Sequence, residues 1–250
     1  MNIYIFTTID NNFLGQLLVK LSKIKKYNFN FIFINENKIN LNNLNKILVR
    51  IISIGFLNCI YFYIKDIFLF NFKKDIFNKL NKNHKILKLT TYDEKRIKNF
   101  IKKDKVDIII SLNFPKKISK KILGISKYGG INLHLGLLPE CMGLYPVIRS
   151  MIYKINFGIT IHRMSNKIDR GQILYKQKLN LKKKDINNII KIYSLLFKKS
   201  FSPLLKVLLK IHKNKKFKNK INSKNKKYFG KFTFNEFLIT ISYKLKSLFF

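Results

Sequence analysis

Apolar residues in the first part of the chain follow the spacing of a strand, a helix and a second strand. Residues 2–8 form a nearly continuous apolar run, residues 13–25 have the periodicity of a helix, and residues 28–35 form a run rich in Phe and Ile. This order predicts a βαβ unit and therefore a parallel sheet. Gly15 is the only glycine between the two runs, so the glycine pattern of a dinucleotide site is absent. The sequence therefore gives no support for a nicotinamide or flavin cofactor.

The pattern changes between residues 36 and 83. Turns rich in Asn and Lys flank apolar patches at residues 44–57 and 60–72, which predict a helical insert that leaves the sheet and returns to it. The longest uncharged apolar run, residues 51–64, is too short to span a bilayer. Its aromatic residues would suit peripheral membrane contact or a homodimer, and packing on the domain's own surface is the favoured interpretation.

Strands and helices are expected again beyond the insert. The predicted elements are, in chain order, a strand at 85–89, a helix capped by a Thr or Asp within 90–94 and ending near 103, a strand at 106–111, and a short helix at 116–123. An antiparallel strand is expected at residues 172–180. Asp185 would cap a further helix that ends near Phe201, where Pro203 interrupts or restarts it.

These elements predict an α/β fold with a Rossmann-like, mostly parallel sheet, flanking helices, the helical insert and a short C-terminal appendage. A chain of 250 residues with 47% apolar composition can bury such a core. The main domain is expected over residues 1–205. A basic linker and short tail are expected over residues 206–250, because residues 212–227 form a Lys/Asn run without hydrophobic periodicity.

A net charge of +39 would ordinarily indicate a nucleic-acid or anionic-membrane partner. However, only 5 of the 51 basic residues are arginine, whereas surfaces that grip phosphate usually combine arginine forks with lysines. An AT-rich coding sequence would give the same excess of Lys, Asn, Ile and Phe on any fold. Composition bias is therefore favoured, and a non-catalytic basic binding protein is the alternative of another class.

Cysteine usage and the N-terminal residues favour a reducing, cytoplasmic location. The two cysteines, Cys59 and Cys141, are too few for a disulfide framework and lack the spacing of a metal site. Residues 1–6 lack the basic region and cleavage site of a signal peptide. A nucleophilic role for Cys141 has to be considered, and a packed, inert thiol is the favoured interpretation.

The candidate chemistry is concentrated in residues 130–139, Gly-Ile-Asn-Leu-His-Leu-Gly-Leu-Leu-Pro. Asn132 and His134 are two positions apart, so on a strand their side chains point to the same side. An amide can stabilise an oxyanion, and an imidazole can move a proton near neutral pH. Asp169, further along the chain, could orient or charge that imidazole. Each residue has an ordinary structural explanation too, but together they predict acyl transfer between nitrogens.

The combined motifs resemble the folate-dependent formyltransferases, which include methionyl-tRNA formyltransferase, glycinamide ribonucleotide formyltransferase and sugar N-formyltransferases. The family signature joins Asn-x-His to a Leu-Pro loop, then Gly-Val/Ile-Thr-x-His, then Asp-x-Gly. The same pieces occur here in the same order, at Asn132-Leu133-His134, Leu138-Pro139, Gly158-Ile159-Thr160-Ile161-His162 and Asp169-Arg170-Gly171. The resemblance extends over about residues 107–180 and implies the formyltransferase fold.

This resemblance implies transfer of a formyl group from 10-formyltetrahydrofolate to a primary amine, without a metal. Asn132 and His134 would polarise the formyl oxygen and stabilise the tetrahedral intermediate, and Asp169 would hold His134 in its working state. The pterin would lie near Asn113-Phe114-Pro115, at the end of a predicted strand. His162 is expected to be structural, because a polar residue on a strand commonly satisfies a neighbour.

The sequence departs from the family pattern after Pro139. The family usually has an aromatic-Arg-Gly there, and this chain has Glu140-Cys141-Met142-Gly143, which places the acceptor in doubt and not the reaction. About seventy residues follow Gln177, too few for the barrel domain that methionyl-tRNA formyltransferases use for tRNA. An amino-sugar nucleotide or similar small amine is the favoured acceptor. Methionyl-tRNA is the runner-up, ahead of glycinamide ribonucleotide, and hydrolysis with water as acceptor is a further possibility.

Overall fold

The computed structural model describes residues 1–8, 12–34, 76–80, 83–181, 186, 188–217, 226–236, 238–240 and 242. The helical patches predicted at residues 44–57 and 60–72 lie outside this part of the chain, as do Cys59 and Asp185. The prediction that Asp185 caps the next helix is wrong, because that helix begins at Ile189 and its cap is Asn188, whose side chain accepts from the Lys191 amide. Of the expected insert, residues 76–80 are described, and they are helical.

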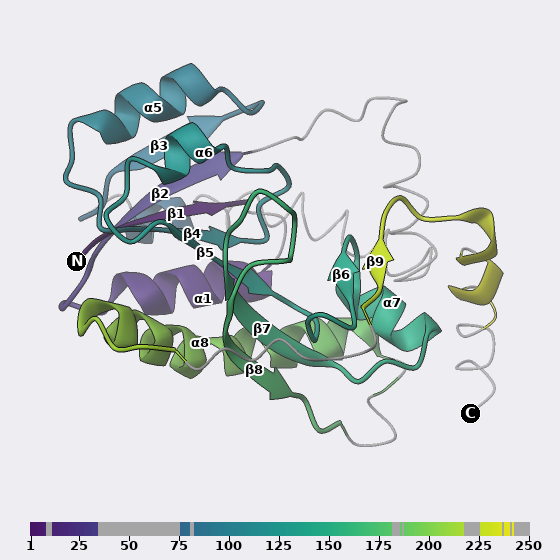
Figure 1. The fold of residues 1–250 in the computed structure, drawn as a ribbon. Coiled ribbons are helices and arrows are strands. Elements are labelled where there is room, and N and C mark those ends of the chain that lie inside the picture. Colours follow the sequence, from purple (N-terminus) through teal and green to yellow (C-terminus); the bar gives the residue numbers. More distant parts are fainter. Residues whose placement is uncertain are drawn as a thin grey trace.

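A seven-stranded sheet forms the centre of the described structure (Figure 1). Its strands are β1 (Asn2–Thr7), β2 (Asn28–Ile34), β3 (Ile86–Leu89), β4 (Ile108–Leu112), β5 (Gly130–His134), β7 (Gly158–Arg163) and β8 (Ile173–Lys178). Their order is β3-β2-β1-β4-β5-β7-β8. The first five in this order are parallel, and β7 and β8 are antiparallel to their neighbours. The prediction of an α/β fold with a mostly parallel sheet is confirmed.

Helices cover both faces of the sheet (Figure 1). On one face α1 (Asn12–Ser22) packs beside α8 (Ile189–His212), and on the other lie α5 (Glu94–Lys102) and α6 (Lys120–Leu123). Alternate residues of β1 separate the two layers: Ile3 and Ile5 join the core beneath α1 and α8, whereas Tyr4 and Phe6 join the core beneath α5 and α6. Burial on both faces explains why the central strands are continuous apolar runs.

Two helices differ from the predictions. The helix expected at 116–123 is confined to α6, which begins after its cap Ser119. The expected interruption at Pro203 is wrong, because α8 continues through this residue to His212 and passes the boundary expected at residue 205. Pro203 is buried. The apolar face of α8 on both sides of it packs into the core, so tertiary packing outweighs the backbone hydrogen bond that proline cannot donate.

Three elements beyond β5 were not predicted. Helix α7 (Pro146–Ile152) follows a loop that contains β6 (Met142–Gly143), and β6 pairs in parallel with β9 (Tyr228–Phe229). The segment expected to be a tail therefore returns to the main domain and lies beside β6 and α7 (Figure 1).

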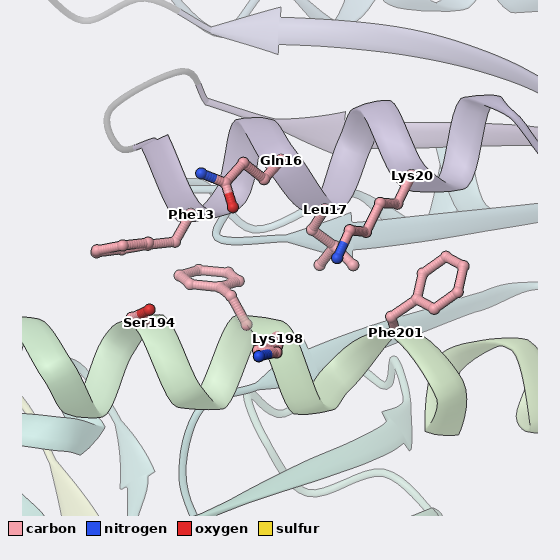
Figure 2. A pocket seen from close by; sticks show the side chains of 8 residues that line it. Phe13, Gln16, Leu17, Lys20, Ser194, Lys198 and Phe201 are labelled. Carbon is pink, nitrogen blue, oxygen red and sulfur yellow. The ribbon is translucent and has the colours of Figure 1, made fainter.

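A cavity of about 340 Å³ lies between α1 and α8 (Figure 2). Its lining combines aromatic and aliphatic side chains with two lysines and two neutral polar residues: Phe13, Gln16, Leu17, Lys20, Ser194, Phe197, Lys198 and Phe201. None of these is a candidate site residue. Among the described residues, no helix is long and apolar enough to cross a bilayer.

Candidate active site

The structure brings Asn132, His134 and Asp169 into one polar cluster, in which the His134 and Asp169 side chains are buried and Asn132 is half-buried, and it adds His162. His134 Nδ1 lies 3.7 Å from Asp169 Oδ2, and His162 Nε2 lies 3.4 Å from Asp169 Oδ1. Asn132 Nδ2 lies 3.1 Å from His162 Nε2. One carboxylate therefore faces two imidazoles, and the amide is linked to it through the second of them.

The sheet positions three of these side chains. Asn132 and His134 lie on β5, and the antiparallel register of β5 with β7 places Asn132 opposite His162 and His134 opposite Thr160. The Thr160 hydroxyl donates to the Gly136 carbonyl (2.7 Å) and accepts from the Leu138 amide (3.1 Å). The Gly-x-Thr-x-His strand thus supports both the catalytic candidates and the loop that follows β5.

Asp169 reaches the cluster from the connection between β7 and β8. Its backbone φ is +55°, a left-handed conformation that Asp tolerates better than most residues. Gly171 completes the turn because a Cβ there would lie 1.7 Å from the Arg163 carbonyl oxygen. The Asp-x-Gly spacing is therefore a requirement of backbone packing, which fixes where the carboxylate emerges.

Backbone contacts define the protonation of His134. Its Nε2 lies 2.7 Å from the Cys141 carbonyl oxygen, which can only accept, so Nε2 carries the proton and Nδ1 has the lone pair in the neutral ring. Burial lowers the pKa of His134, and the nearby charge of Asp169 opposes this only in part. A neutral ring can therefore take up a proton at Nδ1, where Asp169 would stabilise the resulting charge.

Asp169 is held in its ionised form. Burial raises the pKa of this carboxyl, but its interactions with the His162 and His134 rings and with the Gly143 amide outweigh burial, so the pKa is lowered overall. Gly143 N donates to Asp169 Oδ2 at 2.8 Å. A permanent negative charge thus lies beside the ring that would carry the proton.

The expectation that His162 satisfies a neighbour is met, but its neighbours are two of the catalytic candidates. His162 Nδ1 lies 2.9 Å from the Arg163 carbonyl oxygen and must donate to it, which leaves Nε2 to accept from the Asn132 amide in the neutral ring. This contact fixes the orientation of Asn132. The sequence carried one signal that His162 contacts the site: the polar residues Thr160 and His162 alternate with apolar residues on the same strand.

Asn113-Phe114-Pro115 follows β4 at the same edge of the sheet. Leu112 pairs with Leu133 in the parallel β4–β5 register, so this turn begins beside the end of β5. Asn113 has a φ of +53°, and its Nδ2 donates to Thr8 Oγ1 at 3.3 Å. The Phe114 ring packs edge-on against Phe6, whereas Asn113 and Pro115 are exposed.

Cys141 is buried beside the cluster, and burial raises the pKa of its thiol to about 11. A thiol of this kind is a poor nucleophile at neutral pH, in agreement with the packed, inert interpretation. In the part of the chain that the structure describes, no group of three or more His, Cys, Asp or Glu is arranged to hold a metal ion.

A half-buried amide beside a buried imidazole and carboxylate, at the edge of an α/β sheet, is an arrangement typical of group-transfer enzymes. Comparison with known families makes this class specific, because residues 70–192 match the family model described as formyl transferase. Residues 70–192, just under half of the chain, are therefore similar to the formyl transferase family.

Two of the similar proteins carry different names. The bifunctional polymyxin resistance protein ArnA of Wigglesworthia glossinidia brevipalpis is 35% identical over 149 residues, which cover 57% of this chain and 22% of that protein. Methionyl-tRNA formyltransferase of the same organism is 40% identical over 90 residues, which cover 36% of this chain and 28% of that enzyme. The match thus spans less than a third of either relative.

Solved structures share the fold over nearly the whole chain. A 4-N formyltransferase from Francisella tularensis superposes with a TM-score of 0.60 at 20% identity, covering 95% of this chain and 86% of that one. The formyltransferase PseJ from Anoxybacillus kamchatkensis, crystallised with UDP-4,6-dideoxy-4-formamido-L-AltNAc and tetrahydrofolate, superposes with a TM-score of 0.51 at 15% identity, covering 91% and 85%. At these identities the likeness is one of fold.

Proposed function

We propose that this chain transfers a formyl group from 10-formyltetrahydrofolate to the primary amine of a small acceptor, with an amino-sugar nucleotide favoured. The observation that carries this proposal is the polar cluster of Asn132, His134 and Asp169, in which Nδ1 of the buried His134 ring lies 3.7 Å from the carboxylate. Such an arrangement pairs an oxyanion donor with a general base whose charged form is stabilised.

The folate would supply the formyl group, and the chain's own side chains would manage charge and protons. One N–H of Asn132 is directed to His162, and its second N–H is free by valence to donate to the formyl oxygen as negative charge develops there. His134 Nδ1 would take the proton from the attacking amine and return it to the departing folate nitrogen. Attack by the amine would form the new C–N bond and a tetrahedral intermediate, the bond to the folate nitrogen would break as this intermediate collapses, and Asp169 would remain ionised throughout.

The pterin is proposed to lie against the Asn113-Phe114-Pro115 turn and the loop before Asp169. Asn113 and Pro115 are exposed at the sheet edge next to β5, which suits contact with a ligand. Phe114 packs against Phe6 and would support the turn from below. An exposed amide side chain suits the donor and acceptor edge of a pterin.

The choice of acceptor depends on the loop after Pro139. Here Glu140 forms an ion pair with Lys176 at 2.7 Å. The net charge of +39 favours any anionic acceptor, including the diphosphate of a sugar nucleotide. Fold similarity to PseJ, whose crystal contains a formamido sugar nucleotide, supports the small acceptor. Methionyl-tRNA is the second candidate, because methionyl-tRNA formyltransferase is 40% identical over its matched segment.

A direct assay tests the proposal. Purified protein is mixed with 10-formyltetrahydrofolate and, separately, with amino-sugar nucleotides, charged initiator tRNA or buffer alone, and release of tetrahydrofolate is measured. We expect release with at least one amino-sugar nucleotide. Release with charged initiator tRNA, and with no amino-sugar nucleotide, would identify methionyl-tRNA as the acceptor. Equal release in buffer alone would identify a hydrolase. No release in any mixture would favour the non-catalytic basic binding protein over the enzyme.

A further inference from the structure

Two of the contacts that hold His134 and Asp169 come from the backbone of one loop. The Cys141 carbonyl accepts from His134 Nε2 at 2.7 Å, and the Gly143 amide donates to Asp169 Oδ2 at 2.8 Å. Neither contact depends on a side chain of the loop. The relative position of the imidazole and the carboxylate is therefore set by where this backbone lies.

The loop is held by residues far away in the sequence. Met142 N donates to the Lys227 carbonyl (2.9 Å), Leu144 N donates to the Phe229 carbonyl (3.0 Å), and Lys227 N donates to the Pro139 carbonyl (3.2 Å). Gly143 has a φ of +96°, and a Cβ on it would lie 2.1 Å from the Phe229 carbonyl oxygen. Strand β9 therefore lies directly against the backbone that contacts Asp169.

Arg149 fastens β9 and the residues after it to α7. Its side chain is 1% exposed, and its five N–H donors have five acceptors, namely the Leu144, Gly230 and Lys231 carbonyl oxygens and both oxygens of Glu236. The guanidinium also lies over the rings of Phe229 and Phe232, 4.9 and 5.2 Å from their centroids. A planar fork with five donors suits this arrangement, and a lysine could not reproduce it.

Glu236 binds Arg149 and also accepts a hydrogen bond from the backbone of its own segment. Its Oε2 accepts from Arg149 Nη2 and from the Thr233 amide (2.8 Å), while the Thr233 hydroxyl accepts from Glu236 N (3.3 Å). This is a capping box at the start of the helical segment after Thr233. Tyr153 also donates to Glu236 Oε1 at 3.2 Å. The carboxylate thus links α7 to a defined backbone conformation of the tail.

We propose that residues 226–236 form a working part of the active site, in which Arg149 and Glu236 are positioning residues that keep the Cys141 carbonyl and the Gly143 amide in place around His134 and Asp169. The segment lies outside residues 70–192, which match the family model. The catalytic consequence rests on the proposed formyl transfer, whereas the positioning itself does not.

The test uses the full chain with Glu236→Gln, which keeps the size of the side chain and removes its charge. Imidazole ¹⁵N NMR reports the tautomer and the pKa of His134, assigned with His134→Gln. We expect the wild-type ring to have its neutral proton on Nε2, and the variant to show a mixture of tautomers and a changed pKa. Under the proposed function, kcat should fall about tenfold to a hundredfold while KM for the folate changes little, because small misplacement of catalytic groups costs this much.

A matched control is Asp104→Asn, which removes a carboxylate from the ion pair with Lys85, a pair that involves none of the candidate site residues. An equal effect of Asp104→Asn on His134 would overturn the positioning role in favour of general destabilisation. Thr233→Val offers a milder change if Glu236→Gln folds poorly. It should shift the tautomer and the pKa of His134 in the same direction, but by a smaller amount. An unchanged His134 tautomer in both tail variants would overturn the inference. A wild type without transfer activity would overturn the proposed function, and the NMR result would still decide the positioning role.

Discussion

The His162 ring and the Asn132 amide are joined across the β5–β7 ladder, with Nε2 and Nδ2 3.1 Å apart. Because His162 Nδ1 donates to a backbone carbonyl, the ring presents an acceptor to the amide and so decides which way the amide is turned. His162 interacts with Asp169 as well, and it therefore connects the proposed oxyanion donor, Asn132, to the proposed acid–base pair. The four residues therefore act as a unit.

His162→Ala should lower kcat about tenfold with little change in KM for the folate, because the amide of Asn132 loses the partner that orients it. Steady-state kinetics with the accepted amine measure the change. His212→Ala is a matched control, since His212 is an exposed residue at the end of α8. An unchanged kcat in His162→Ala would return His162 to a purely structural role.

Asp169→Asn should lower kcat about a hundredfold or more, because the protonated His134 loses its counter-charge. The Asp169 carboxylate raises the pKa of His134 against the larger effect of burial, so its removal should lower that pKa further. The acid limb of the profile of kcat/KM against pH should therefore move to lower pH. A limb that moved to higher pH, or not at all, would contradict the assigned pairing.

Gly143→Ala should destabilise the fold by about 1–3 kcal/mol, because the added methyl group meets the Phe229 carbonyl in a backbone conformation that favours glycine. Urea denaturation measures the free energy of unfolding. Two control variants separate the steric clash from the backbone conformation. Gly129→Ala tests the conformation, since Gly129 has a φ of +66° and open space around its Cβ position, and Gly230→Ala has neither a positive φ nor a clash. We expect the losses to rank Gly143 above Gly129 above Gly230, and another order would refute the close approach of β9.

The acid stability of the chain should depend on Glu236. Burial raises the pKa of this carboxyl, but the hydrogen bonds from Arg149 and Thr233 outweigh burial, so the folded-state pKa lies below the ordinary value of 4.5. The ionised carboxylate therefore adds stability that is fully present above the ordinary value and is lost as pH falls through the folded-state pKa. Urea unfolding of wild type and Glu236→Gln should show a gap that is constant between pH 6 and pH 7 and narrows toward about pH 3. A gap that widened in acid would contradict this sign.

Nucleic-acid binding should be weak and should depend only shallowly on salt, if the lysine excess reflects composition bias. The measurement is the affinity for tRNA and for duplex DNA between about 50 and 200 mM salt. Tight binding with a steep slope, as expected when 6–10 phosphates are neutralised, would instead indicate a dedicated polyanion surface.

The central strands of the sheet could be read from the sequence because they are buried on both faces, which leaves runs such as residues 108–112 with Ser111 as the one polar position. The three catalytic candidates could be found because the motif order is retained. By contrast, Pro203 was misleading, since local propensity predicts a break and the packing of α8 maintains the helix.

The β6–β9 pair could not be predicted from local pattern. Each strand has two residues, too few for a period, and their pairing depends on a contact between segments more than 80 residues apart. The Thr-x-x-Glu spacing at Thr233 and Glu236 was the readable signal of order in this region. Nothing in that spacing identifies Arg149 as the partner, because only the fold brings the two together.

The bond between Arg149 and Glu236 joins positions 87 residues apart, and closing such a separation is entropically costly and tends to occur late in folding. The sheet can therefore assemble before the loop that contacts His134 and Asp169 acquires its final position. A chain released before residue 236 has been synthesised would contain every catalytic candidate and still lack the contact between Arg149 and Glu236 that holds the loop beside them. Competence for catalysis would then be acquired only once residue 236 has been made, so that shorter products would be folded in the sheet and silent in the reaction.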